Sequence, residues 1–308
     1  MGLTFTLAVV MGAGASSAMA DDVPARVQIE TREQLLRLDG SGDLGQVTDL
    51  DVLCNECIEA LASVRHGKAI QRLRIEGCAT DEYLAYHHVA CIWISERAAR
   101  ALGRSRALPA LTELTITAHG RPLTALLAGR ITSSLRRLRV TTDAAGVAAL
   151  GKASRLGALT HLAIIAHDNK SAAAVRSLVS SRHLRKLDTL RFVSSDSEAE
   201  QSLDVDAIRA IATSLRLPAL RTLDVSWAYV GDDATAALVA APWITQLERL
   251  GIVYTGAGKR TLEQLAVHGP WTGLSVVWVD SAAARHALPG FAGLLGDPDR
   301  WDAEIGTR

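Results

Sequence analysis

A short arrangement of apolar and polar positions recurs along most of the chain. It consists of an aliphatic residue, two variable residues, a second aliphatic residue, one variable residue and a third aliphatic residue. The last two aliphatic residues are two positions apart, so they point to one face of a strand, and the residue between them points to the other face. Copies begin at Val47, Ile70, Val89, Leu111, Leu135, Leu159, Leu187, Leu220, Leu247 and Leu274.

Stretches with the periodicity of helices separate these strand patterns. Apolar residues three or four positions apart, such as Val205, Ile208 and Ile211, give such a stretch one apolar face. Asp204 and Asp232 stand where the N-caps of helices are expected. The helices that this pattern predicts are 144–153, 172–178, 204–215, 232–240 and 259–267.

A strand and a helix in each unit of roughly 19 to 33 residues indicate a repeat array. The pattern resembles the leucine-rich-repeat family, in which Asn or Cys follows L-x-x-L-x-L. This Asn/Cys position is occupied by Asn55, Cys78, His119, Asp143, His167, Ser195, Ala228 and Thr255. In the family, that side chain commonly bonds the backbone of the turn, which Ala228 cannot do. The irregular lengths resemble the ribonuclease-inhibitor-like and bacterial members. The resemblance covers about residues 45 to 285 and implies an α/β solenoid, with a curved parallel sheet on the concave face and helices on the convex face.

The chain divides into four expected segments. Residues 1–20 combine an apolar run with Ala18-Met19-Ala20, which is typical of a secretory signal peptide, although no Lys or Arg follows Met1. Export to the periplasm or the cell exterior is therefore expected. The end repeats of an array have no neighbour on one side and need a cover. We expect 21–46 to cap the first repeat, 47–287 to form the solenoid and 288–308 to cap the last repeat.

Composition and motifs narrow the function. A net charge of +0 gives no general affinity for nucleic acid. With 48% hydrophobic but only 4% aromatic residues, the core must be aliphatic. Beyond the first twenty residues, no stretch approaches the roughly 20 continuous apolar residues of a membrane helix. The chain contains no Gly-x-Ser-x-Gly, His-Glu-x-x-His or complete Gly-x-x-x-x-Gly-Lys-Ser/Thr motif. We expect no catalytic activity, no cofactor and no bound metal.

The variable positions inside the strand patterns point to the open face of the sheet, where arginine is over-represented in the middle copies. Two interpretations fit: a solvated face, or a surface that binds a protein, an anionic polymer or a glycan through Arg and Trp anchors. The second interpretation makes the protein a non-enzymatic binding scaffold. Its candidate binding residues are Arg72, Arg74, Trp93, Arg137, Arg139, His161, Arg191, Asp224, Arg249 and Trp278.

The cysteines gather near the N-terminal end, where His66, His87 and His88 also lie. Extracellular leucine-rich-repeat proteins often have a cysteine-containing N-terminal cap, so the resemblance implies disulfides. The spacing also fits half of a zinc site or a redox dithiol, which makes a metal-binding or redox protein the alternative function. The pairing stays open, although two of the cysteines occupy corresponding turns of adjacent copies. The four residues are Cys54, Cys57, Cys78 and Cys91.

Overall fold

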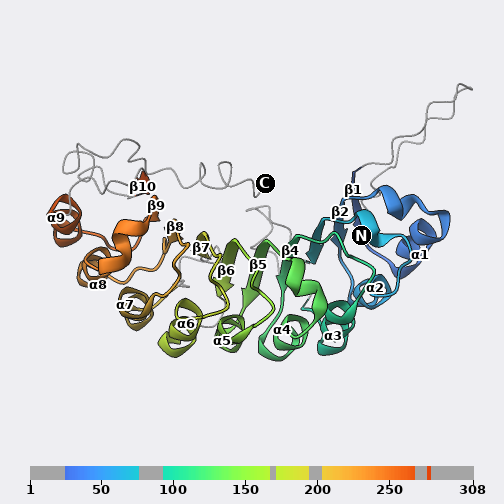
Figure 1. Cartoon of the computed structure of the whole chain (residues 1–308), viewed down its shortest axis with the longest axis horizontal. Helices are drawn as coiled ribbons and strands as arrows, with labels where there is room; N and C mark the ends of the chain where they lie inside the picture. The colour runs from blue at the N-terminus through green and yellow to red at the C-terminus, as the bar shows by residue number, and fades with distance from the viewer. Residues whose placement is uncertain (1–24, 76–92, 167–170, 194–202, 268–275, 279–308) are drawn as a thin grey trace, which may run out of the picture.

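A computed structural model describes residues 25–75, 93–166, 171–193, 203–267 and 276–278. In these residues the strands form one parallel sheet, in which each strand pairs with the next strand along the chain. One α-helix lies between each pair of consecutive strands. The two layers form an arc, with the strands along its inner side and the helices along its outer side (Figure 1). The described part of the chain is therefore the α/β solenoid that the repeated pattern predicts.

The strands are short and the helices cover only one side of them. The strands are β1 (Arg26–Ile29), β2 (Asp49–Val52), β3 (Arg72–Ile75), β4 (Glu113–Thr117), β5 (Arg137–Thr142), β6 (His161–Ala166), β7 (Thr189–Val193), β8 (Thr222–Asp224), β9 (Arg249–Gly251) and β10 (Val276–Trp278). The helices are α1 (Arg32–Ser41), α2 (Asn55–Leu61), α3 (Glu96–Arg104), α4 (Gly120–Leu127), α5 (Ala144–Lys152), α6 (Ala172–Val179), α7 (Val205–Ser214), α8 (Asp232–Val239) and α9 (Lys259–Val267). Short 3-10 helices cover Asp43–Gln46, Gly67–Ala69, Arg130–Ser134 and Pro242–Gln246. None of the described helices combines the length and apolar character needed to cross a bilayer.

A column of leucines runs through the core beneath the sheet. The second aliphatic residue of each pattern pairs in register with its counterpart on the next strand, and each of these leucines is at most 2% exposed. Burying one such side chain contributes about 1.5–3 kcal/mol, so the column is a main source of stability. Its members are Leu50, Leu73, Leu114, Leu138, Leu162, Leu190, Leu223 and Leu250.

One predicted strand is wrong and one strand was not predicted. β3 pairs directly with β4, so the copy that begins at Val89 does not supply a strand between them. Of the three aliphatic residues of that copy, only Ile94 lies in the described residues, and it is buried just before α3, outside any strand. At the other end, β1 pairs with β2 and extends the sheet into the expected capping segment. In this copy Pro24 stands where the pattern has its first aliphatic residue, so the pattern did not predict the strand.

Helix capping agrees with the prediction at Asp204 but not at Asp232. The Asp204 carboxylate accepts a 2.7 Å hydrogen bond from the backbone N–H of Ala207. The N-cap of α8 is instead Gly231, whose φ of 85° suits glycine. Asp232 is the first residue of α8, and its carboxylate bonds the start of α9 in the next repeat. It therefore connects two repeats.

The Asn/Cys position of the repeat has different roles in different copies. The Asn55 amide donates to the carbonyl of Trp93 at 3.1 Å and accepts from the backbone N–H of Ser95 at 3.1 Å. Asp143 instead caps α5 by accepting from Gly146 N–H at 2.8 Å. Ala228 is fully buried and offers no polar side chain. A regular asparagine ladder is therefore absent from the described copies. The expected leader, 1–20, and the expected C-terminal cap, 288–308, lie outside the described residues.

Candidate binding face

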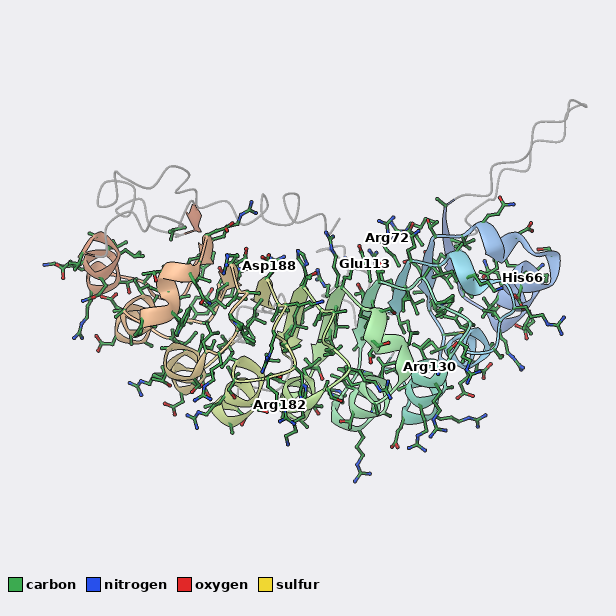
Figure 2. All side chains as sticks on the ribbon, in the orientation of Figure 1. His66, Arg72, Glu113, Arg130, Arg182 and Asp188 are labelled. Atoms are coloured by element: carbon green, nitrogen blue, oxygen red, sulfur yellow. A yellow bond between two sulfur atoms is a disulfide. The ribbon has the colours of Figure 1, made fainter. Side chains whose placement is uncertain are left out.

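Two rows of side chains cross the sheet on the side away from the helices, which we call the inner face. They are formed by the first and third residues of strands β1–β9. Figure 2 shows Arg72 and Glu113 along the inner side of the arc, whereas Arg182 lies on the side of the helices. The first row is Arg26, Asp49, Arg72, Glu113, Arg137, His161, Thr189, Thr222 and Arg249, and the second row is Gln28, Asp51, Arg74, Thr115, Arg139, Ala163, Arg191, Asp224 and Gly251.

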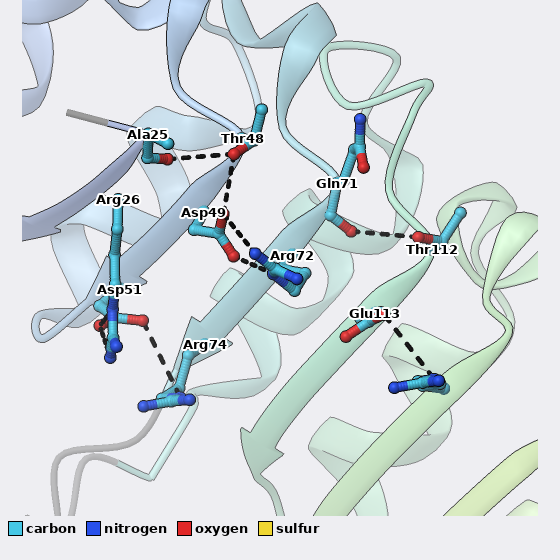
Figure 3. A network of polar contacts seen from close by, with 11 residues as sticks. Ala25, Arg26, Thr48, Asp49, Asp51, Gln71, Arg72, Arg74, Thr112 and Glu113 are labelled. Carbon is cyan, nitrogen blue, oxygen red and sulfur yellow. Dashed lines mark hydrogen bonds and ion pairs between the residues drawn. The ribbon is translucent and has the colours of Figure 1, made fainter. Parts of the chain in front are cut away.

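Arginines and carboxylates pair with each other at the N-terminal end of the inner face (Figure 3). Arg26 donates to Asp51 at 2.7 Å, and Arg72 bonds both carboxylate oxygens of Asp49. Arg74 Nε lies 3.9 Å from Asp51. The hydrogen bond from Arg72 lowers the pKa of Asp49, against the opposing effect of burial. The side chains of Arg26 and Arg72 are 60% and 61% exposed, so each ion pair contributes at most about 1 kcal/mol.

Arg139 lies near the middle of the second row and has no carboxylate within ion-pair distance among the described residues. Its Nε is buried and has no hydrogen-bond partner. Its neighbours in the row are the small residues Thr115 on β4 and Ala163 on β6. A buried donor without an acceptor costs about 1–3 kcal/mol.

The first row beside Arg139 contains charges of both signs. Arg137 Nε lies 3.8 Å from Glu113 Oε1, and the Arg137 side chain is 40% exposed. Burial lowers the pKa of His161, and the charge of Arg137 lowers it further, so His161 is neutral at pH 7. The charges of Asp188 and Glu113 act on His161 in the opposite direction, so two carboxylates lie near the arginines in this region.

On β7 and β8 the side chains of the inner face are largely buried. Arg191 Nε lies 3.3 Å from Asp224 Oδ2, and their side chains are only 11% and 9% exposed. Thr189 and Thr222 in the first row are 5% and 6% exposed. The sequence pattern places these four residues on an open face, but the structure shows them largely inaccessible. Arg191 and Asp224 therefore form a buried ion pair and are not available as contact residues in this structure.

Three other candidates lie apart from Arg139. Trp93 precedes α3 and is not part of the sheet; its ring stacks on His119 with centroids 3.8 Å apart and an interplanar angle of 13°. Arg249 lies on β9, at the C-terminal end of the first row, and is half-buried. Trp278 ends β10, and its side chain lies outside the described part of the structure. The candidate face is thus smaller than the sequence pattern predicts.

The cysteines are only partly described. The Sγ atoms of Cys54 and Cys57 lie within bonding distance at the start of α2, with Cα atoms 5.2 Å apart. A bridge between them stays within one turn, and the sequence, which places Cys57 and Cys78 in corresponding turns of adjacent copies, left the pairing open. Cys78, Cys91, His87 and His88 lie outside the described residues, so the disulfide network stays a prediction. Within the described ranges, no three His, Cys, Asp or Glu side chains form a group that could hold a metal.

An aromatic cluster that the sequence pattern does not reveal follows β8 and β9. Trp227, Tyr229 and Tyr254 adopt positive φ angles of 66°, 48° and 52°. The rings of Trp227 and Tyr254 have centroids 4.1 Å apart, and Tyr229 and Tyr254 are 41% and 40% exposed. The left-handed conformation costs a bulky residue roughly 1–2 kcal/mol, so the surrounding fold must hold these turns in place. Nothing in the local sequence indicates this conformation.

The described residues form an α/β solenoid of repeated strand and helix units, with Arg139 near the centre of its inner face. No protein-family model matches the chain, and no curated protein matches it. Among solved structures, the chain is similar to a chain from the crystal structure of the Rad7 and Elc1 complex in yeast. The identity is 13%, the match covers 86% of this chain and 83% of that chain, and the TM-score is 0.37. Similarity at this level transfers neither a function nor a partner.

Proposed function

We propose that the protein is a non-enzymatic scaffold that binds a protein partner on the inner face, with Arg139 as the central contact. The observation that carries this proposal is the buried Nε of Arg139, which has no acceptor in the described structure. A carboxylate of the partner would pair with the half-buried Arg139 side chain and neutralise its charge. Charge-assisted hydrogen bonds of this kind are about twice as strong as neutral ones.

The distribution of charge favours a protein over a polyanion. A polyanion binds more tightly as more of its charges are neutralised by cations, so carboxylates between the cations weaken its binding. On the inner face, carboxylates interrupt both rows: Asp49 and Glu113 alternate with Arg72 and Arg137 in the first row. A partner surface with its own mixture of charges matches this pattern, and the arginines supply specificity and register.

The same ion pairs support the absence of catalysis. A general base at neutral pH needs a pKa near 7. The Arg72 hydrogen bond shifts the pKa of Asp49 downward, away from that value. Asp51 is held by Arg26 at 2.7 Å. These carboxylates are therefore structural partners of arginines. The proposed location, outside the cytoplasm, depends only on the leader-like pattern of residues 1–20.

The test compares partner capture by three forms of the full chain from envelope and culture-fluid fractions. The Arg137→Ala/Arg139→Ala variant removes two positive charges from the inner face. The control Arg121→Ala/Lys152→Ala removes two exposed charges from α4 and α5, the helices before and after β5. We expect the first variant to lose at least tenfold of its affinity for a protein captured by the wild type, and the control to retain it. Equal binding by all three forms would exclude Arg139 as the central contact.

A second measurement locates the contact directly. A photo-cross-linking residue replaces Thr115, which is half-buried beside Arg139 on the inner face. A matched cross-linker replaces the exposed Thr213 on α7. We expect the captured partner to cross-link through position 115. Cross-linking through position 213 alone would contradict binding on the inner face.

A further inference from the structure

A hollow lies on the side of the solenoid, where the chain leaves α6 and α7 on its way to β7 and β8. Its volume is about 440 Å³, which is within the range of small-molecule sites. Arg182 and Arg185 follow α6, and Arg216 follows α7; all three line the hollow and are exposed. This site is separate from the inner face, which is the proposed partner surface.

The positive charge of the hollow is not compensated. Its lining contains no acidic residue, and no described carboxylate lies within ion-pair distance of Arg182, Arg185 or Arg216. Arg185 Nε donates to the carbonyl of Arg182 at 3.2 Å, and Arg182 Nε donates to His183 Nε2 at 3.4 Å. These bonds orient two guanidinium groups and leave their terminal N–H groups as donors. Like charges gathered in one hollow repel, and an anion bound between them would relieve that repulsion.

A second hollow on α3 provides a comparison within the same chain. It is lined by Arg97, Arg100 and Arg104, again three arginines, but also by Glu96. Arg100 pairs with Glu96, and Arg97 Nε lies 3.0 Å from Glu59 Oε2. Most of that positive charge is therefore compensated. Both hollows are therefore lined by three arginines, but only the hollow on α3 has carboxylates that pair with them.

A buried hydroxyl also points to a ligand. Ser181 lines the hollow and is only 5% exposed. Its Oγ accepts a 3.2 Å hydrogen bond from the backbone N–H of His183, and its own O–H has no acceptor among the described residues. Buried hydroxyls normally have hydrogen-bond partners for their protons. An oxygen atom of a ligand in the hollow would accept this proton.

The lining defines the chemical class of the ligand. Arginine side chains bind phosphate oxygens through two parallel N–H donors. The charge of three arginines is matched better by a doubly charged phosphate than by a singly charged carboxylate. Leu215, Leu217 and Pro218 form an apolar part of the lining. We propose that the hollow binds a small phosphomonoester, with its phosphate on the arginines and Ser181 and its organic part against the apolar residues.

The experiment titrates the purified full chain with inorganic phosphate and with phenyl phosphate in chloride buffer, by calorimetry. We expect saturable binding, with phenyl phosphate at least threefold tighter because of its apolar ring. The Arg182→Ala/Arg185→Ala/Arg216→Ala variant should bind phenyl phosphate at least tenfold more weakly. The matched Arg97→Ala/Arg100→Ala/Arg104→Ala variant removes the same charge and should bind like the wild type.

The outcomes separate the parts of the proposal. Equal losses in the two triple variants, or no saturable binding by the wild type, would overturn the site. Equal affinities for inorganic phosphate and phenyl phosphate would overturn the apolar contact and make free phosphate the ligand. If the triple variant fails to fold, the single exposed substitution Arg216→Gln replaces it and should still weaken binding severalfold. Ser181→Ala should weaken the binding of both ligands, since the hydroxyl is proposed to contact the phosphate.

Discussion

The hydroxyl of Thr261 donates a 2.7 Å hydrogen bond to the carboxylate of Asp232, which belongs to the preceding repeat. The same carboxylate accepts from the backbone N–H groups of Gly258, Arg260 and Thr261 at 2.8, 2.9 and 2.9 Å. These are the free N–H groups at the start of α9, where a negative charge is favourable. One side chain of α8 therefore caps the helix of the next repeat.

This cap makes the stability of the last described repeats depend on pH. Burial alone would raise the pKa of Asp232, but the hydrogen bonds from Thr261, Arg260 and Gly258 outweigh it and lower the pKa to about 2. Because the folded pKa is below the unfolded value, the stabilisation is present above about pH 4 and is lost as the pH falls toward 2. We expect Asp232→Asn to cost about 1–2 kcal/mol at pH 7, and progressively less below pH 4.

Denaturant unfolding between pH 2 and pH 7 measures this difference. The control is Asp206→Asn, an acid on α7 whose side chain is 74% exposed. It should change the unfolding free energy by less than about 0.5 kcal/mol at pH 7. A difference between Asp232→Asn and the wild type that is the same at every pH would contradict the cap.

Two helical glycines should respond in opposite ways to alanine. A Cβ at Gly151 on α5 would lie 2.5 Å from the carbonyl oxygen of Ser177 on α6, whereas a Cβ at Gly40 on α1 meets nothing within 4 Å. Gly40→Ala should stabilise the protein by up to about 1 kcal/mol through helix propensity. Gly151→Ala should destabilise it by about 1–3 kcal/mol, because α5 and α6 must move apart.

Thermal unfolding of the two single variants tests this close approach. The two changes have the same chemistry, so propensity alone predicts the same sign for both. A stabilised Gly151→Ala variant would mean that the backbones of α5 and α6 are farther apart than the structure shows.

The Asn55 amide should contribute to the attachment of the segment that enters α3. Asn55→Ala leaves the carbonyl of Trp93 and the N–H of Ser95 without this partner, at an expected cost of about 1 kcal/mol. Asn55→Asp keeps the acceptor for Ser95 and removes the donor to Trp93, so an intermediate loss is expected. Hydrogen exchange at the Ser95 amide should accelerate in the alanine variant and not in the aspartate variant. Unchanged exchange in both would exclude the contact.

The Arg191–Asp224 ion pair should show strong coupling in a double-mutant cycle. Both side chains are largely buried, so removal of one leaves the other as a buried charge, at an expected cost of about 3 kcal/mol or more. Arg191→Met and Asp224→Leu should each be destabilising. The double variant should lose less than the sum of the two, with a coupling of at least about 1 kcal/mol. Additive losses in equilibrium unfolding would mean that the two residues act independently.

The strand pattern alone determined the layer architecture and the orientation of side chains. Alternate residues of a strand point to opposite faces, so the positions of Leu138 and Arg139 in the pattern place one in the core and the other on the inner face. That inference is local, and the structure confirms it at nine of the ten predicted copies. It fails at the copy that begins at Val89, because a local pattern does not determine which segment pairs with β3.

The tertiary structure decided which polar groups are open and which are paired, because both depend on residues far apart in the chain. Arg139 and Arg191 occupy equivalent positions in the second row, yet only Arg191 has a carboxylate partner nearby, on β8. Arg97 and Arg182 likewise each lie in a segment with several arginines, but Glu59 from the preceding repeat pairs only with Arg97. Hydrogen bonds and ion pairs across repeats depend on distances of a few ångströms in space, which the order of residues along the chain does not specify.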